Sequence, residues 1–218
     1  MKLEWRQLIA RKAGDSEILD LDDAPASFPP YTQEYLAAFD RTESLGLKAP
    51  PRILARKDCL DMSEAMPVLL NYFNVYKKHL PGRTLTIHTD IRQALIETQG
   101  IPCNLTTGWM ELHGKPICQH GDEKIIRFLR DKEQAYAREG LPFHVWLTSP
   151  SLEVLDLTFA MSLGWAETEV ECASRIVYQS VHEPIGDRIY HPMLVGHDFF
   201  EQTGAMASVT HEAPTGLQ

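Results

Sequence analysis

The sequence predicts an α+β protein in which helices pack on a mainly antiparallel sheet. Apolar residues recur at helical spacing over 89–99, strand-like runs lie at 104–112 and 143–148, and turn residues separate the strands. A helix, a hairpin, a second helix and a meander follow one another. This order is typical of an antiparallel sheet beside helices rather than of a doubly wound parallel sheet.

One domain accommodates these elements, because 44% hydrophobic residues in a chain of 218 suffice to bury a large core. We expect residues 1–80 to form a helical scaffold and residues 82–180 to form the core that contains the sheet. The last residues, 204–218, are small and polar, so we expect a flexible tail there.

The N-terminal third predicts short helices around a loop. Apolar residues at 3–9 share one helical face, residues 31–39 can form another helix, and residues 66–80 carry apolar side chains at helical spacing. The stretch 15–30 is acidic and rich in proline, and we expect it to be a surface loop.

The helix over 89–99 is the clearest element of the chain. Its apolar stripe stops at Gly100, a residue type that commonly ends helices. The run 101–112 that follows is rich in β-compatible residues, and a turn at 113–115 returns the chain along 116–119. We expect a hairpin here.

A second helix and a strand meander complete the predicted core. Asp122 can cap a helix that ends before Gly140. Strands are predicted at 143–148 and 152–159, joined by a Ser-Pro-Ser turn, and a further β-like run lies at 174–180.

The charge of the chain excludes several classes of partner. With 21 basic and 30 acidic residues the formal charge is −9, which repels nucleic acid and anionic lipid. The N-terminal residues lack the apolar run of a signal peptide, and no stretch approaches the ~20 apolar residues that span a membrane. We therefore expect a cytoplasmic protein whose partner is a small molecule or a peptide.

Cysteines and histidines predict neither a disulfide scaffold nor a metal site. The four cysteines, at positions 59, 103, 118 and 172, are widely spaced and form no CxxC pair. Histidines near Cys118, and His191 and His197 near the C-terminus, lack the paired spacing of zinc ligands. No glycine-rich phosphate-binding motif occurs, so we expect no cofactor.

Two residues on neighbouring predicted strands can form a dyad. His144 lies in FHVWLT and Asp156 in VLDLT, so a hairpin can bring imidazole and carboxylate together. A carboxylate that binds one ring nitrogen fixes the tautomer and leaves the other nitrogen to take a proton from a nucleophile. Taken alone, the two residues favour structural roles, a half-buried strand histidine and a strand-end cap.

The order of motifs from Gly82 to Thr158, about a third of the chain, resembles the papain-like and transglutaminase-like superfamily. In that superfamily a cysteine opens a helix, and the end of that helix and three later strands carry further motifs. The matching motifs are Gly100-Ile101-Pro102, Thr107-Gly108-Trp109, His144-Val145-Trp146 and Asp156-Leu157-Thr158. The resemblance implies a papain/transglutaminase-like core in which His144 is the base and Asp156 its orienting partner.

A threonine stands in the slot of the nucleophilic cysteine. Counting back about one helix from Gly100 reaches Thr84, which best fills the slot. A threonine hydroxyl is a far weaker nucleophile than a thiol beside a histidine. Cys59 also precedes a predicted helix and is the alternative nucleophile, but the Gly-Ile-Pro sequel is missing there and two nearby aspartates disfavour a thiolate.

Two functions remain open. The first is a catalytically degenerate relative that binds a peptide- or acyl-type ligand in the cleft, which Trp109, Trp146 and Arg83 could line. The second is an active amide-bond hydrolase or acyltransferase that uses the same dyad with Thr84 or Cys59. The weak hydroxyl nucleophile favours the first.

Overall fold

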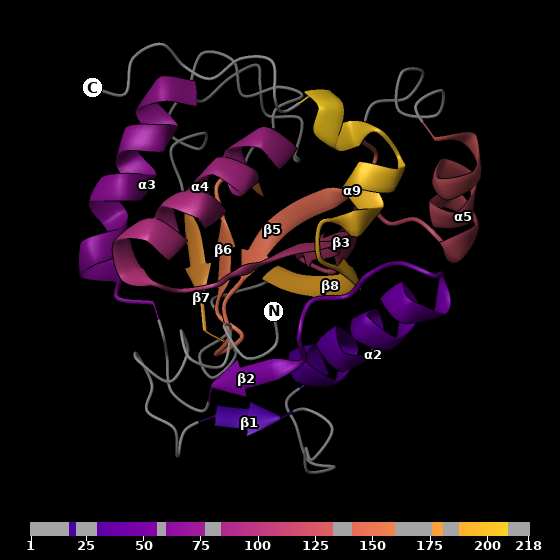
Figure 1. Cartoon of the computed structure of the whole chain (residues 1–218), viewed down its shortest axis with the longest axis horizontal. Helices are drawn as coiled ribbons and strands as arrows, with labels where there is room; N and C mark the ends of the chain where they lie inside the picture. The colour runs from indigo at the N-terminus through magenta and orange to yellow at the C-terminus, as the bar shows by residue number, and fades with distance from the viewer. Residues whose placement is uncertain are drawn as a thin grey trace.

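The computed structural model describes residues 18–20, 30–55, 60–76, 84–132, 141–159, 176–180 and 188–208. Within them helices pack on an antiparallel sheet, which confirms the predicted α+β class. The sheet lies between α3 (Met62–Tyr76) and α4 (Thr84–Gln99) on one side and α2 (Pro30–Ser44) on the other (Figure 1). None of the helices in these residues has the length and apolar character needed to cross a membrane.

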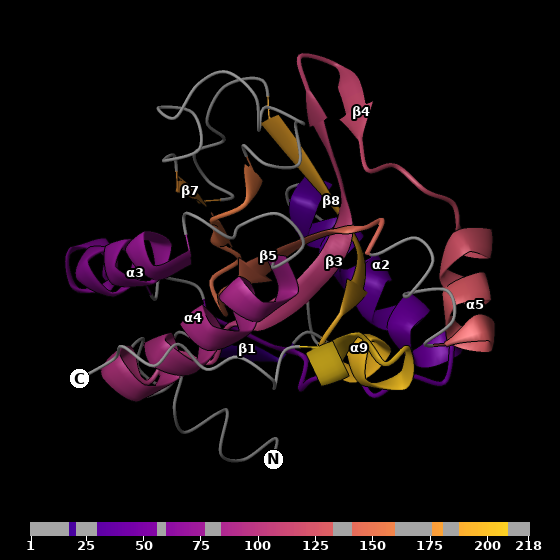
Figure 2. The same cartoon turned by 90° about the horizontal axis from the view of Figure 1, so that it is seen from above.

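Strand β3 (Asn104–Leu112) organises the sheet, because both of its edges are paired. Strand β8 (Arg188–Val195) lies along one edge. Strands β5 (His144–Thr148) and β4 (Lys115–Ile117) share the other edge, one beside each half of β3. The β3–β4 hairpin extends beyond the helices (Figure 2).

The meander continues the sheet on the β5 side. Strand β6 (Val154–Asp156) pairs with β5, and β7 (Val177–Gln179) pairs with β6, both antiparallel. The predicted strands 104–112, 143–148 and 152–159 are therefore present, although the last is shorter than predicted. The sheet order is β8-β3-β5-β6-β7.

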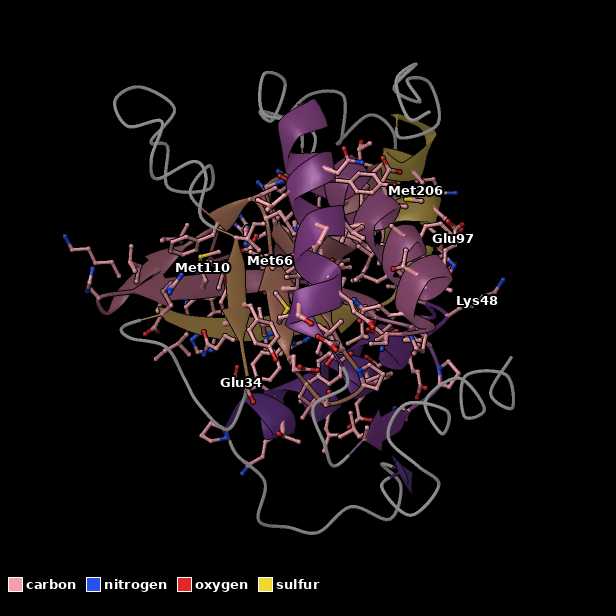
Figure 3. The ribbon with its side chains drawn as sticks, turned by 90° about the vertical axis from the view of Figure 1, so that its left-hand side faces the viewer. Glu34, Lys48, Met66, Glu97, Met110 and Met206 are labelled. Carbon is pink, nitrogen blue, oxygen red and sulfur yellow. The ribbon has the colours of Figure 1, made fainter. Side chains whose placement is uncertain are left out.

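Helix α4 begins at Thr84, earlier than the predicted residue 89, and packs on β3 and β5. Its Leu95 belongs to the same buried apolar cluster as Leu155 of β6. The helix ends as the sequence predicts. Gly100 has φ +68°, and its N–H donates to the carbonyl oxygen of Ile96 at 2.9 Å. Helix α3 lies against α4, and Met66 on its outer side is 37% exposed (Figure 3).

Helix α2 covers the opposite face and packs along β8. Its tyrosines bind sheet residues through their hydroxyl groups. Tyr31 accepts a hydrogen bond from Trp146 Nε1 at 3.0 Å, and Tyr35 accepts one from Asn104 Nδ2 at 3.0 Å. Because the predicted helix at 31–39 runs on to Ser44, it reaches the end of β8.

Strand β8 is missing from the sequence-based prediction. Its apolar alternation is interrupted by His191 and Pro192, and proline lacks the N–H that a central strand needs. The structure tolerates Pro192 because β8 pairs only with β3 among the described strands, and because the pairing slips between Thr107 and Gly108.

Two loop predictions are wrong in part. Strand β1 (Ile18–Asp20), within the expected surface loop 15–30, pairs antiparallel with β2 (Ile53–Ala55). The expected tail begins with the 3₁₀ helix Ala205–Ser208, in which Ala205 is fully buried. Short pairings and single turns of this kind leave no clear period in a sequence.

Helix α5 (Asp122–Asp131) begins where predicted, but its N-cap is Gly121 and Asp122 makes no capping hydrogen bond. The carboxylate of Asp122 instead lies 3.2 Å from Arg41 Nε of α2. The predicted helix at 3–9 and the remainder of the tail, 209–218, lie outside the described residues.

Candidate functional site

His144 and Asp156 lie within hydrogen-bond distance, as their positions on neighbouring strands predict. His144 Nε2 is 2.7 Å from Asp156 Oδ2, and the two side chains are 1% and 0% exposed. Leu147 lies opposite Leu155 in the β5–β6 pair, which places Asp156 diagonal to His144 on one face of the sheet. His144 Nε2 donates the hydrogen bond, because an ionised carboxylate can only accept.

Asp156 is a buried carboxylate ion held by several donors. The Tyr190 hydroxyl donates to Oδ2 at 2.9 Å, and the backbone N–H of Thr158 donates to Oδ1 at 2.8 Å. Burial is the largest single influence and raises the pKa of Asp156, but the charge and hydrogen bond of His144, together with His88 and the Thr158 N–H, hold this pKa below its usual value. Burial and the neighbouring Asp156 charge raise the pKa of Tyr190 well above its ordinary value, so its hydroxyl remains a donor.

A second histidine, His88 of α4, lies beside the dyad. Its Nδ1 donates to the carbonyl oxygen of Thr84 at 2.8 Å, and its Nε2 accepts the backbone N–H of Leu157 at 3.3 Å. Nε2 is also 3.7 Å from Asp156 Oδ1, beyond hydrogen-bond distance. Burial lowers the pKa of His88 to about 4, so this ring is neutral at pH 7.

Sequence reasoning missed both His88 and Tyr190. His88 falls on the apolar stripe of α4, three residues from Leu85 and three from Ile91, and a histidine within such a stripe was the available signal. Tyr190 belongs to β8, and its role follows only from the pairing of β8 with β3.

Thr84, the candidate for the nucleophile slot, is the first residue of α4. Because its carbonyl oxygen binds His88, the first turn of α4 is joined to the end of β6. The Thr84 side chain is half-buried and makes no hydrogen bond to His144 within the described part of the chain. The other candidates, Cys59 and Arg83, lie outside the described residues.

The two tryptophans expected to line a common groove lie on opposite faces of the sheet. Trp146 is 0% exposed and its N–H donates to the Tyr31 hydroxyl, so it belongs to the core. Trp109 is half-buried and stacks on His191, with ring centroids 3.9 Å apart. Side chains alternate along β3, so Trp109 points away from the face that carries Trp146 and His144.

The described cysteines do not have the surroundings of activated thiols. Cys103 is buried, and burial together with the charge of Asp156 raises the pKa of the half-buried Cys118. In the described ranges no three His, Cys, Asp or Glu side chains are grouped to hold a metal ion. His191 is instead paired with Glu34, its Nδ1 2.9 Å from the carboxylate.

Comparisons of the chain with models of protein families, with curated proteins and with solved structures find no match. The residues of the site and their chemistry therefore indicate which functions are possible. A carboxylate-bound imidazole can hold a fixed orientation in the site or act as a base.

Proposed function

We propose that this protein is a catalytically degenerate relative of the papain-like and transglutaminase-like proteins that binds a peptide- or acyl-type ligand at the dyad. The observation that carries the proposal is the buried 2.7 Å hydrogen bond between His144 and Asp156, at the end of β6 that contacts the first turn of α4. His144, Asp156 and Thr84 lie on β5, β6 and α4, and these are the elements from which the proposal takes the base, its orienting carboxylate and the nucleophile slot.

The side chain in the slot argues against amide-bond cleavage. Thr84 offers a hydroxyl, which needs a strong general base to become a nucleophile. His88 is the histidine closest in sequence, but its Nδ1 donates to the Thr84 carbonyl and its Nε2 accepts the N–H of Leu157. Both nitrogens of His88 are committed, so this ring holds the helix in place rather than activating the hydroxyl.

The ligand class follows from what surrounds the slot. The first N–H groups of a helix have no partners within the helix and carry partial positive charge. A carbonyl oxygen of a peptide or acyl group placed there accepts hydrogen bonds from them. Binding of this kind needs no thiol.

The proposal is tested by restoring the thiol. At pH 7 we expect iodoacetamide to label Thr84→Cys at least about tenfold faster than Thr86→Cys, because only the first thiolate gains His144 as well as the helix end. Adding His144→Ala should slow the labelling of Thr84→Cys but leave that of Thr86→Cys unchanged. Equal rates for the two cysteine variants, or a rate that His144→Ala leaves unchanged, would remove the papain-like assignment.

A competition experiment tests the ligand. An N-acetylated dipeptide amide at millimolar concentration should slow the labelling of Thr84→Cys and leave that of Thr86→Cys unchanged, since only the first lies in the proposed site. Equal slowing of both, or of neither, contradicts peptide binding at the dyad. Rapid labelling of Cys59 in the unmodified protein, together with cleavage of an amide substrate, would instead favour an active hydrolase.

A further inference from the structure

A pocket lies at the far end of β3 and β5 from the dyad. It encloses about 560 Å³ between the 48–51 segment, Arg92 of α4, residues 104–105 of β3 and the 196–197 turn. Asn104 pairs with Thr148, whereas Gly108 pairs with His144, so about 13 Å of strand separates the pocket from the dyad. This volume is within the range of small-molecule sites.

Among the described residues that line the pocket, the ionisable ones are all basic. They are Lys48, Arg92 and His197, although acidic residues outnumber basic ones in the chain as a whole. The exposed Lys48 side chain reaches outward from the molecule (Figure 3).

Arg92 is a partly desolvated cation without a described counter-ion. Its Nε donates to the carbonyl oxygen of Cys103 at 2.7 Å, which fixes the plane of the guanidinium. None of the described residues offers Arg92 a carboxylate within ion-pairing distance. Burial lowers the pKa of Arg92, as expected for a cation that has lost part of its hydration. The two terminal nitrogens remain as donors.

The wall of the pocket is closely fitted. Gly196 has φ +103°, its N–H donates to the Leu105 carbonyl at 2.8 Å, and a Cβ there would lie 3.0 Å from Pro50 Cδ. The carboxylate of Asp198, just behind this turn, accepts the N–H of Lys48 at 2.8 Å and a hydrogen bond from Gln202. Asp198 therefore holds the wall together, and the carboxylate of Glu201 lies 3.6 Å from His197 Nε2.

We propose that this pocket binds a small organic anion whose carboxylate or phosphate group meets the terminal nitrogens of Arg92. The guanidinium fork matches the paired oxygens of either group, and Lys48 adds a second positive charge. The apolar body of the ligand lies against Pro50 and Leu105. The site is independent of the dyad, so each can fail without the other.

Titration of the ¹⁵N-labelled protein with phenyl phosphate, benzoate and benzamide tests the proposal. We expect saturable shifts at the Gly196 and Leu105 amides and at Arg92 Nε–H with the two anions, and none with the neutral amide. The tighter of the two anions identifies the headgroup. Shifts that map elsewhere, or equal binding of benzamide, overturn the proposal.

Variants assign the charge that binds. Arg92→Gln should lower the affinity for the tighter-binding anion at least about tenfold, as expected for loss of a charge-assisted pair. Lys48→Gln should weaken it by a smaller factor, and Lys115→Gln, an exposed charge on the β3–β4 hairpin, should leave it unchanged. If Arg92→Gln does not fold, the comparison of Lys48→Gln with Lys115→Gln decides, and equal affinities in that pair contradict the site.

Discussion

Tyr190 on β8 donates its hydroxyl to Asp156 on β6 over 2.9 Å, although β3 and β5 lie between the two strands. In a flat sheet three strand spacings would separate their backbones by about 14 Å. The hydrogen bond therefore requires the sheet to curl toward this face. The position of the Asp156 carboxylate therefore depends on β8 as well as on its own strand, β6.

Tyr190→Phe should lower the free energy of unfolding by about 1–3 kcal/mol at pH 7, because a donor to a buried ion is lost. The loss should shrink in acid. A carboxylate with a lowered pKa stabilises the fold above its unfolded pKa, and this contribution disappears as the pH falls through the folded pKa, which lies below the ordinary value. Urea unfolding at a series of pH values from 7 downward measures the effect. In an Asp156→Asn background the same substitution should cost less, and equal costs in both backgrounds would show that the bond contributes nothing.

His88 should make stability fall on mild acidification. An unfolded histidine takes up a proton near pH 6.5, whereas folded His88, with a pKa of about 4, does not until the pH is lower. The unfolded state therefore binds more protons between these values, and unfolding becomes easier as the pH falls from 6.5 to 4, by up to about 3 kcal/mol in all. Above pH 6.5 His88 is neutral in both the folded and the unfolded state, so its contribution to stability no longer changes with pH.

Urea unfolding of His88→Gln across pH 4–7 isolates this contribution. The variant should be less stable at pH 7 and should show a flatter pH dependence than the unmodified protein. His113→Asn, in the exposed turn between β3 and β4, should keep the original slope. A slope in His88→Gln identical to that of the unmodified protein would mean that His88 is not buried as a neutral ring.

Gly108→Ala should destabilise the fold by about 2 kcal/mol or more, as overpacking beside a rigid backbone does. A Cβ at this position would overlap the carbonyl oxygen of His191 and lie 2.7 Å from the Trp146 ring. Thermal unfolding and near-ultraviolet circular dichroism report the loss. Gly121→Ala, where a Cβ meets nothing within 4 Å, is the matched control and should cost under about 1 kcal/mol. Similar losses in both variants would exclude a special role for Gly108.

Local pattern predicted α4, the β3–β4 hairpin and the β5–β6 pair, because each has a regular period and a turn residue at its end. The distance between His144 and Asp156 then followed from the pairing of adjacent strands. These predictions needed only contacts between neighbours in sequence.

The contributions of β8 and His88 could not be predicted in the same way. β8 is interrupted by Pro192, and its partner β3 lies far away in sequence. No local pattern therefore predicts that β8 pairs with the free edge of β3. His88 has a role only because the start of α4 meets the end of β6, a tertiary contact that helical periodicity does not contain. Trp146 reads as a groove residue in its motif but is enclosed by α2.

The pairing of Thr106 with Val195 has a consequence for synthesis of the chain. Until residues 188–195 leave the ribosome, one edge of β3 has no strand to satisfy its N–H and C=O groups, and such edges recruit other chains. Folding is therefore completed late in translation, and contacts so distant in sequence form slowly. We expect chains truncated before residue 188 to aggregate rather than to accumulate as a smaller folded protein.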